Sequence, residues 1–563
     1  MVRVECNEKK REVEKPVKKR SFWIVVLLAL CVAVSACSGG GNNGANSANG
    51  GANGGETSGG GSENGDGADN GGGAQERPHL ELNWFVHSSA DAILPKGDQD
   101  FIRKAIEEKF NVTLNIEHMP MGSDFDTRLS LLMSSGDTPD LFVSTGVNSQ
   151  KFIIDGITAD MTPFVTPEKM PNYFKWISEV ELQRYAVEKK FERAPLIFPR
   201  KVYRSYYIRQ DWLDNLGLKM PTNYEEMMDV MRAFTFNDPD RNGKNDTYGM
   251  SAAGNGSTVS WDFPQWIQHG LIGALMVRDN QYVDNQSDAN VQYVLQGIKD
   301  MMAEGIVDPD WFLNKGTEHV DKAVGGKVGI IVGGTKSFAF DSDPTSIQNR
   351  TKAINPDANW MPFHPFADTG TWVESLPDLP FMFSRDTAEK SPEKIERIVE
   401  ILDWMASEEG FLLINYGQEG KHYARNGSTI TITQAHLDAL QKDVIEQGNF
   451  QQVYRFFYSH NPEPEPLGLT IVDERLSERD NEIVKTIESY KLYPSIGTNV
   501  SPPPGFNLAD FRAKMREYQA KILFEEPDAS NWPKYREELM TTYGGQQMID
   551  AYTEQIRAAG VIK

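Results

Sequence analysis

The stretch 80-LELNWFVH-87, 101-FIRKAIEEKF-110 and 112-VTLNI-116 decides the fold of this chain. In the first and third segments apolar and polar residues alternate, which is the pattern of a β-strand with one buried face. In the middle segment the apolar residues recur every three to four positions, which indicates a helix with one apolar stripe. A strand, a crossover helix and a strand form a right-handed βαβ unit. The stretch therefore predicts an α/β fold with a mostly parallel sheet covered by helices.

The next segments continue the same alternation. A helix is expected to end at Gly136, because glycine readily adopts the left-handed C-cap conformation and Pro139 cannot continue a helix. The apolar run 141–143 then predicts another buried strand. With 563 residues, the chain is too long for one core, since domains usually hold about 100–200 residues. We therefore expect two large lobes.

The composition is that of an ordinary globular protein, with 39% hydrophobic and 24% charged residues. The formal net charge of -23 argues against nucleic acid as a partner and against adsorption to anionic lipid. The three cysteines, Cys6, Cys31 and Cys37, all lie near the start of the chain. The folded body is therefore predicted to have neither a disulfide nor a thiolate metal site.

The N-terminal segment has the order of a secretory signal, in which basic residues precede an apolar run at 22–34. The run is too short to span a bilayer, which takes about 20 residues. It ends in Ser35-Ala36-Cys37, which resembles a bacterial lipobox. We expect a lipoprotein signal peptide at 1–36 and a diacylated, palmitate-bearing Cys37 on the outer face of the cell membrane; the alternative is a plain cleaved signal.

A tether is predicted at 37–78. Residues 38–74 contain 16 glycines and seven asparagines and almost no large apolar side chain. Such a segment cannot bury enough surface to offset the entropy of ordering, so we expect it to be disordered. It would hold the folded body at a distance from the membrane.

Four motifs occur in an order that resembles a known family. Together they resemble the extracellular solute-binding proteins (family 1 type) of carbohydrate ABC importers, especially the lipoprotein branch that includes the alginate-oligosaccharide binders. The resemblance covers about residues 79–563. The motifs are 135-SGDTPD-140, 209-RQDWLDNLGL-218, 326-GKVG-329 and 416-YGQEGK-421.

The resemblance implies a fold like that of the type II periplasmic binding proteins, with two α/β lobes, a hinge between them and a chain that crosses more than once. By this analogy the first lobe holds residues 79–205 and 358–425. The second holds 206–357 and 426–563. The resemblance also implies that ligand binds between the lobes, that the hinge closes on it, and that an ABC permease recognises the closed form.

A loop with the spacing of a calcium site begins at Asp238. Oxygen-bearing side chains stand at positions 1, 3, 5 and 9, and glycine stands at position 6, as in an EF-hand loop. Position 12 is Gly249, so the usual bidentate glutamate is missing; the alginate binders have a glutamate directly after a similar loop, where this chain has Thr247. We expect a structural Ca²⁺ ion, and the alternative is a polar turn that only mimics the pattern. The candidate ligands are Asp238, Asp240, Asn242, Lys244 through its carbonyl group, Asp246 and Thr247.

Aromatic residues outside helical stripes are the candidates for ligand contact. Sugar rings stack on Trp and Tyr through their C–H faces, while polar side chains hydrogen-bond their hydroxyls. For each candidate, packing in the core is the alternative, and Arg209 could instead pair with a carboxylate. If the ligand were an anionic uronide, Arg209 is the residue predicted to meet its charge. The candidates are Trp84, Tyr206, Arg209, Trp261, Trp266 and Trp372.

Local catalytic signatures are missing from the sequence. It holds no GxSxG elbow, HExxH helix, phosphate-binding loop or dinucleotide fingerprint. The absence argues against an enzyme, and the resemblance above implies a monomeric, lipid-anchored binding protein that captures an oligosaccharide and delivers it to the transmembrane subunits of an importer. A secreted glycosidase or lyase is the alternative, because paired acidic residues leave no local motif.

Overall fold

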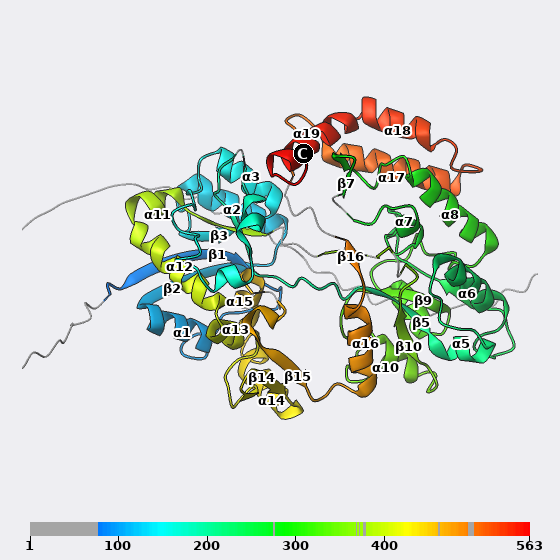
Figure 1. Cartoon of the computed structure of the whole chain (residues 1–563), viewed down its shortest axis with the longest axis horizontal. Helices are drawn as coiled ribbons and strands as arrows, with labels where there is room; N and C mark the ends of the chain where they lie inside the picture. Colours follow the sequence, from blue (N-terminus) through cyan, green and yellow to red (C-terminus); the bar gives the residue numbers. More distant parts are fainter. Residues whose placement is uncertain are drawn as a thin grey trace, which may run out of the picture. The chain divides into compact units, whose positions relative to one another are not determined.

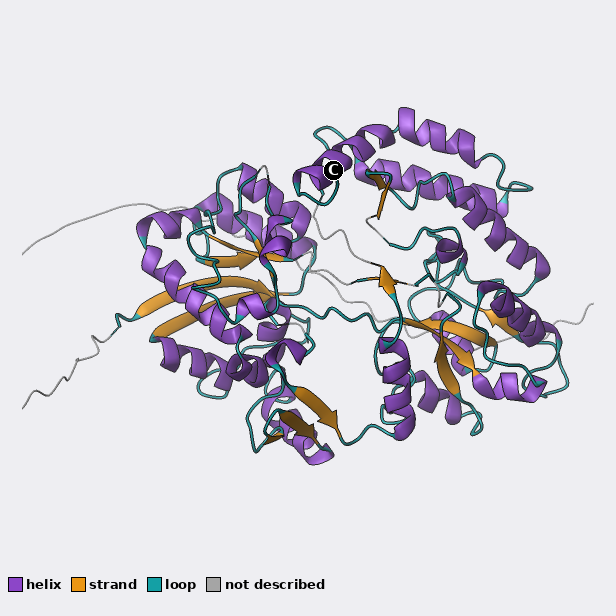
Figure 2. Ribbon diagram, viewed as in Figure 1, coloured by secondary structure: helices purple, strands orange, loops and turns teal. Residues whose placement is uncertain are grey.

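The computed structural model describes residues 77–563, apart from positions 188, 274–275, 367–368, 371, 375–378, 460–461 and 494–499. The predicted signal peptide, Cys37 and nearly all of the predicted tether lie outside the described residues. Two α/β lobes, each built on its own sheet, make up the described chain (Figures 1 and 2). None of the described helices has the length and apolar character needed to cross a membrane.

Lobe 1 is built on a five-stranded sheet of order β2-β1-β3-β12-β4. β1 runs parallel to β2 and β3, and β12 runs antiparallel to β3 and β4. The predicted βαβ unit is therefore present, and two antiparallel strands extend it. The strands are β1 (Leu80–His87), β2 (Val112–Met119), β3 (Leu141–Val143), β4 (Ala194–Pro195) and β12 (Pro380–Phe383), with a small sheet of β13 (Ala424–Asn426), β14 (Thr429–Ile432) and β15 (Thr470–Asp473).

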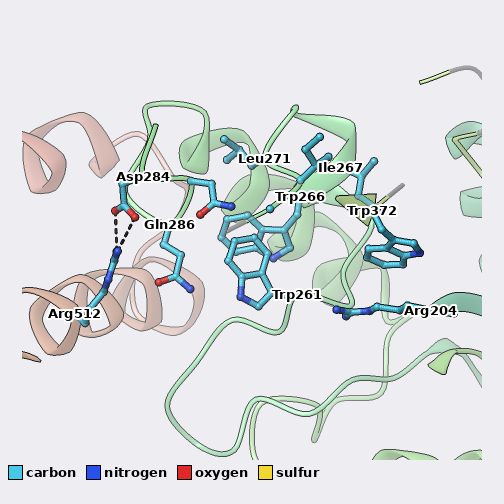
Figure 3. Close-up of a pocket in the computed structure, with 12 residues that line it drawn as sticks. Arg204, Trp261, Trp266, Ile267, Leu271, Asp284, Gln286, Trp372 and Arg512 are labelled. Carbon is cyan, nitrogen blue, oxygen red and sulfur yellow. Dashed lines mark hydrogen bonds and ion pairs between the residues drawn. The ribbon is translucent and has the colours of Figure 1, made fainter. Parts of the chain in front are cut away.

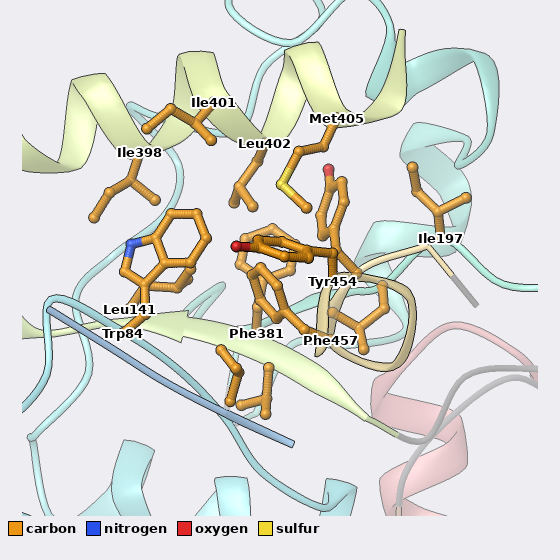
Figure 4. Close-up of a cluster of buried hydrophobic side chains, with 14 of the residues drawn as sticks. Trp84, Leu141, Ile197, Phe381, Ile398, Ile401, Leu402, Met405, Tyr454 and Phe457 are labelled. Atoms are coloured by element: carbon orange, nitrogen blue, oxygen red, sulfur yellow. The ribbon is translucent and has the colours of Figure 1, made fainter. Parts of the chain in front are cut away.

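Lobe 1 also contains helices. They are α1 (Phe101–Phe110), α2 (Ser123–Ser135), α3 (Gly146–Ile154), α4 (Glu179–Gln183), α11 (Arg385–Lys390), α12 (Pro392–Ala406), α13 (Glu408–Asn415), α14 (Gln434–Leu440) and α15 (Gln451–Phe457), with short 3-10 turns at Tyr173–Lys175 and Glu465–Leu467 and a π-turn at Gln441–Ile445. α12 begins with Pro392, whose missing N–H costs nothing at the first helical position. Its apolar stripe faces the sheet and points at Trp84 and Phe457, whose rings lie 5.3 Å apart (Figure 4).

Lobe 2 is built on a four-stranded sheet of order β10-β5-β9-β6. β5 alternates between two cores: Tyr206 and Ile208 face a large cluster, whereas Tyr207 faces a smaller one that includes Ile483 and Ile487. The strands are β5 (Ser205–Arg209), β6 (Tyr248–Met250), β9 (Val328–Gly333) and β10 (Trp360–Phe363), with two small pairs, β7 (Met276–Arg278) with β8 (Gln281–Val283) and β11 (Trp372–Val373) with β16 (Leu492–Tyr493).

The helices of lobe 2 include a group at the end of the chain that closes over the large cluster. They are α5 (Gln210–Leu216), α6 (Tyr224–Phe236), α7 (Gln265–Gln268), α8 (Val291–Glu304), α9 (Glu318–Val324), α10 (Ile347–Lys352), α16 (Glu478–Glu488), α17 (Leu508–Phe524), α18 (Trp532–Thr541) and α19 (Gly545–Ala558).

Two of the predicted lobe segments differ from the structure. Residues 358–425 were expected in lobe 1, but β10 pairs with β5 and Trp372 packs in the lobe 2 core. Residues 426–563 were expected in lobe 2, but side chains between Ile430 and Leu469 pack in the lobe 1 core. The reason is the aromatic face of α15, which covers β1 rather than the second sheet. The chain therefore crosses between the lobes at 199–204, between β11 and β12, and just after β15.

Candidate functional site

A cavity of about 330 Å³ opens in lobe 2 (Figure 3). Its wall comes from the segment around α7, from the loop between β8 and α8, from Arg204 just before β5, and from residues of β11 and α17. Three tryptophans, two arginines and one carboxylate stand among apolar and amide side chains. The lining residues are Arg204, Trp261, Trp266, Ile267, Leu271, Ile272, Gly273, Asp284, Asn285, Gln286, Trp372 and Arg512.

The aromatic wall is built in two layers. Trp266 is buried, and its indole N–H donates to the carbonyl oxygen of Ser260 at 2.9 Å, which fixes the ring. Trp261 is half-buried and lies against it, with ring centroids 4.4 Å apart. Trp261 therefore presents the accessible aromatic face, and Trp266 supports it from behind.

Trp372 is held between other side chains. Its ring stacks on Tyr206, with centroids 5.9 Å apart and an interplanar angle of 25°. The Arg204 guanidinium lies 4.4 Å from the centre of the same ring, and it also donates to Asp262 at 2.5 Å. Trp372 is thus a rigid part of the wall, and Arg204 is the cation placed over it.

A second arginine is fixed by a buried carboxylate. Asp284 is 3% exposed, and its two oxygens accept from Arg512 at 2.7 Å each. Ser287 also donates to Asp284. These bonds to Asp284 outweigh the effect of burial and raise the pKa of Arg512, so the arginine stays charged. The carboxylate is saturated by donors from the protein itself.

Two amides complete the polar part of the wall. Asn285 is 1% exposed, and its side-chain Nδ2 has no hydrogen-bond partner among the described residues. Gln286 is half-buried beside it. A buried donor without a partner is costly, by about 1–3 kcal/mol, so Asn285 marks a position where an acceptor from a ligand would be stabilising.

The structure gathers three of the six predicted contact residues, Trp261, Trp266 and Trp372, in one wall. Tyr206 supports that wall from the core, where it is 1% exposed. Their role in binding stays a prediction.

Two other candidates lie away from the cavity. Trp84 is 2% exposed and packs in the lobe 1 core, because the alternation of β1 turns its side chain inward. Arg209 is also buried, and it pairs with Asp211 through bonds of 2.8 Å and 2.6 Å while its guanidinium lies over Trp212. The alternative reading of Arg209, a structural ion pair, is the correct one.

Sequence reasoning missed several lining residues. Asp284, Asn285 and Gln286 form a polar run directly after β8 and before α8, and polar residues in such a connection could have drawn attention. Arg204 lies next to the predicted lobe boundary, which is also a usable signal. Arg512 has no such signal, because it stands in a long helix far along the chain and reaches Asp284 only through the tertiary fold.

The predicted calcium loop lies between α6 and β6. Asp238 accepts from the backbone N–H groups of Asn242 and Gly243, both at 2.9 Å. The Asn242 amide donates to Asp240 at 2.8 Å and to Asp246 at 3.1 Å. Asn242 therefore bonds to all three carboxylates of the loop, to Asp238 through its backbone N–H and to Asp240 and Asp246 through its side-chain amide.

The carboxylates of this loop provide part of what a bound cation needs. Burial, together with contact with Asp238 and the charge of Asp246, raises the pKa of Asp240. A cation among these groups would relieve their repulsion. In the described part of the chain, however, no three His, Cys, Asp or Glu side chains already share one metal position. An ion would therefore also need the Asn242 oxygen and the carbonyl group of Lys244.

Thr247 was predicted as a calcium ligand, and its hydroxyl is engaged elsewhere in this structure. It is 2% exposed, and its hydroxyl donates to the carbonyl oxygen of Phe234 at 2.6 Å. The side chain thus faces the body of lobe 2, where it ties the end of the loop to α6. Asp246 is paired with the Lys327 ammonium at 2.6 Å.

The two-lobe fold of the described chain is similar to that of solved solute-binding proteins. Similar solved structures include an HMO-binding, ABC-transporter-associated solute-binding protein from Bifidobacterium longum infantis, with TM-score 0.64, 15% identity, and 86% of this chain and 100% of that chain covered. The alginate-binding protein AlgQ2 without calcium ion has TM-score 0.57, 17% identity, and coverage of 85% and 98%. An EF-hand mutant of FusA from S. pneumoniae, in complex with fructo-nystose, has TM-score 0.54, 17% identity, and coverage of 85% and 99%. These likenesses confirm the predicted fold class.

Sequence relatives carry the comparison further. The polygalacturonan/rhamnogalacturonan-binding protein YtcQ of Bacillus subtilis is 22% identical over 478 residues, which is 81% of this chain and 88% of YtcQ. Lipoprotein LipO of B. subtilis is 25% identical and covers 58% of this chain and 65% of LipO. The fructooligosaccharide ABC transporter substrate-binding protein FusA of Streptococcus pneumoniae is 23% identical and covers 48% of this chain and 52% of FusA. No protein-family model matches the chain.

These relatives confirm the resemblance to the substrate-binding proteins of carbohydrate ABC importers. YtcQ and FusA are named for binding, and none of the relatives above is named for catalysis, in agreement with the prediction that the chain is not an enzyme. Substrate-binding proteins of importers work outside the cytoplasm, which agrees with the predicted extracytoplasmic location.

Proposed function

We propose that the protein is the extracytoplasmic, lipid-anchored substrate-binding component of an ABC importer, and that it captures an oligosaccharide at the cavity of lobe 2. The observation that carries the proposal is the layered tryptophan wall of this cavity. Trp261 offers an accessible ring face of the kind on which sugars stack, and Trp266 and Trp372 hold the wall rigid. Arginine and amide groups at its edge supply hydrogen bonds.

Capture would use both lobes. A ligand stacked on Trp261 keeps its opposite face exposed to solvent. Closure of lobe 1 over that face would bury the ligand. Because a ligand contacting both lobes favours the closed form, binding shifts the population toward closure. The closed monomer would then be recognised by the permease of the importer.

The N-terminus would attach this body to the membrane. The lipobox-like sequence ending in Cys37 supports removal of residues 1–36 and acylation of the Cys37 thiol. Palmitate labelling of the full chain and of a Cys37→Ala variant tests this step. Label on the parent alone supports the anchor, whereas equal label on both contradicts it.

Calcium would fasten the loop at 238–246. Asp238, Asp240 and Asp246, with the Asn242 oxygen and the carbonyl group of Lys244, are the groups that would hold the ion. The pKa of Asp240, which is raised by burial and by its neighbours Asp238 and Asp246, supports this assignment. The ion would stabilise the connection between α6 and β6 and would take no part in ligand chemistry.

The experiment that tests the proposed function is a thermal-shift and calorimetry screen of residues 77–563 against plant and algal oligosaccharides, with product analysis of every mixture. A binding protein gains stability as the logarithm of the ligand concentration above Kd, by about 2.7 kcal/mol at a ligand concentration of 100 Kd. Stabilisation by one class of glycan without product formation supports the proposal. Glycan cleavage, or stabilisation by none of the glycans, contradicts it.

A further inference from the structure

The loop between β8 and α8 is held in place by side chains of the C-terminal helices. Gln519 of α17 donates to the backbone carbonyl oxygen of Gln286 at 2.8 Å. Two side chains of α18 hold the next two carbonyl groups, and the three donors lie 233–249 residues further along the chain than the carbonyl groups they meet. The bonds from α18 run from Arg536 to Ser287 and from Trp532 to Asp288, each at 2.9 Å.

The donors that hold this loop are themselves buried. Gln519 is 3% exposed and Trp532 is 0% exposed. At the start of the loop, Arg512 of α17 bonds to both oxygens of Asp284 at 2.7 Å. Loops whose backbone bonds mainly to water are the mobile parts of a fold. The buried donors of α17 and α18 therefore give this loop a fixed backbone before a ligand arrives.

Gln286 is the lining residue of this loop whose side chain is left for a ligand. The Asp284 carboxylate is bonded to Arg512 and to the Ser287 hydroxyl, and Asn285 is 1% exposed. The Gln286 side chain is half-buried and lines the cavity. It makes no hydrogen bond to a described residue, since the bond from Gln519 goes to its backbone. The clamped backbone thus presents one accessible amide to the cavity.

Gln286 and Trp261 line the same cavity and complement each other chemically. In the view of Figure 3 the Gln286 amide lies between the ion pair of Asp284 with Arg512 and the ring of Trp261. Trp261 offers an aromatic face to the C–H face of a sugar ring. The amide has an acceptor and a donor group in one plane, so it can bond two neighbouring hydroxyl groups on the rim of that ring.

We infer that Gln286 recognises a pair of neighbouring free hydroxyl groups on a sugar ring stacked on Trp261, and that α17 and α18 position it for this role. The inference rests on the proposed function and assigns hydroxyl recognition at the same site to one side chain. Gln519 is a positioning residue, because it bonds to the backbone of Gln286 and does not line the cavity. An amide on a fixed backbone loses little freedom on binding, so more of its hydrogen-bond energy appears as affinity.

The first test compares three side chains at position 286. Maltotriose, mannotriose, galactotriose and xylotriose are titrated by calorimetry into residues 77–563 of the parent, of Gln286→Glu and of Gln286→Met. Methionine keeps the length of the side chain and removes both hydrogen bonds, so it should weaken binding of a trisaccharide that the parent binds by about tenfold. Glutamate keeps the acceptor and loses the donor, so its affinity should fall between the other two. A side chain needed only for its shape would give methionine the affinity of the parent.

The second test asks whether α17 acts through Gln286. Gln519→Met removes the donor to the Gln286 carbonyl group, so it should weaken binding by about threefold and speed amide hydrogen exchange at 284–290. The double variant with Gln286→Met should bind no more weakly than Gln286→Met alone, because the two residues form one chain of contacts. Gln547→Met makes the same change on the exposed surface of α19 and should alter neither affinity nor exchange. Melting temperatures of the unliganded variants show whether each one folds.

The outcomes separate this inference from the proposed function. Parent affinity in folded Gln286→Met, or affinity in Gln286→Glu no higher than in Gln286→Met, overturns the assignment of Gln286 and leaves the binding function standing. Additive losses in the double variant, or unchanged exchange in Gln519→Met, overturn the positioning role of Gln519. If none of the trisaccharides binds the parent, the inference is overturned, and the broader glycan screen then decides whether the binding function fails with it.

Discussion

Trp261 is the side chain whose loss should cost the most binding with the least damage to the fold. It is half-buried, whereas Trp266 behind it is buried and hydrogen-bonded to Ser260. We predict that Trp261→Ala weakens glycan binding by about thirtyfold, or about 2 kcal/mol, as expected for a tryptophan at the centre of a contact. Calorimetry with the glycan that stabilises the parent measures this change.

A surface aromatic residue provides the control for Trp261. Phe236 ends α6 and is 52% exposed, so Phe236→Ala removes a ring from lobe 2 outside the cavity wall. Its affinity should match that of the parent. Equal affinity in Trp261→Ala and the parent would show that the glycan does not use the tryptophan wall.

His364 predicts a pH dependence of stability. Burial lowers its pKa from 6.5 to about 4, and its Nδ1 accepts from the backbone N–H of Phe366 at 2.9 Å, which requires the neutral ring. Between these two pH values the His364 ring is protonated in the unfolded state and neutral in the folded state. The stabilisation is therefore complete above pH 6.5 and is lost as the pH falls toward 4.

Denaturant unfolding at several pH values tests this. We expect the free energy of unfolding to fall by on the order of 1–2 kcal/mol more in the parent than in His364→Asn over this range, after allowance for the partial exposure of the ring. Asparagine keeps an acceptor for Phe366 but does not titrate. Parallel curves for the two proteins would contradict the assignment.

The two tryptophans Trp84 and Trp261 show what single residues allow a sequence to predict. Both stand outside helical stripes, and both were candidates for ligand contact. The alternation of β1 indicates that Trp84 shares a face with Leu80, Leu82 and Val86, but it does not tell which face the rest of the chain covers. That choice is made by α12 and α15, which lie more than 300 residues further along.

At the scale of elements, the loop between α6 and β6 predicts a calcium effect on stability. The carboxylates of Asp240 and Asp246 both accept from the Asn242 side-chain amide there, and Lys327 already neutralises Asp246 at 2.6 Å. We expect Ca²⁺ at 100 times its dissociation constant to stabilise residues 77–563 by about 2.7 kcal/mol. Melting curves in calcium and in chelator measure the gain.

The variant Asp240→Asn distinguishes a loop that binds calcium from a loop that is only a polar turn. The pKa of Asp240 is raised in the protein, so removing its charge should leave the calcium-free protein equally stable or slightly more stable. In calcium the variant should lose most of the gain, because a charged ligand is missing. If calcium leaves the melting temperature of the parent unchanged, the loop is only a polar turn.

The helices and strands themselves were easier to predict than the elements against which they pack. The period of the apolar residues defined β1, α1 and β2, and the cap at Gly136 ended α2, because these signals are local. The assignment of β14 and α15 to lobe 1 depends on which sheet offers an uncovered face, and no local pattern records that. The cavity shows the same limit, since Arg512 meets Asp284 across 228 residues of sequence.

At the scale of the whole molecule, the first crossing between the lobes is bonded to residues on both sides of the third. Lys201 lies in the first crossing, and its ammonium is 2.8 Å from Glu465, near the third crossing, and 3.4 Å from Glu488 of α16. Glu463 accepts from the backbone N–H groups of Arg200 and Lys201 at 2.7 Å and 2.6 Å. The first and third crossings are therefore coupled, and a hinge made of them would bend as one unit.

Such a hinge predicts a ligand-dependent change in the distance between the lobes. Residues 38–563 contain no cysteine, so Val180→Cys and Leu313→Cys in residues 77–563 give two unique dye positions, one on each lobe, with exposures of 63% and 65%. If the ligand contacts both lobes, saturating glycan should raise the transfer efficiency, since closure brings the lobes together. The same protein with Trp261→Ala should respond only at about thirtyfold higher glycan concentration, because its closed form is stabilised through the same wall. A transfer efficiency that stays constant while calorimetry shows full occupancy would mean that the tryptophan wall binds glycan without closure. The importer would then have to recognise the ligand itself rather than the shape of its carrier.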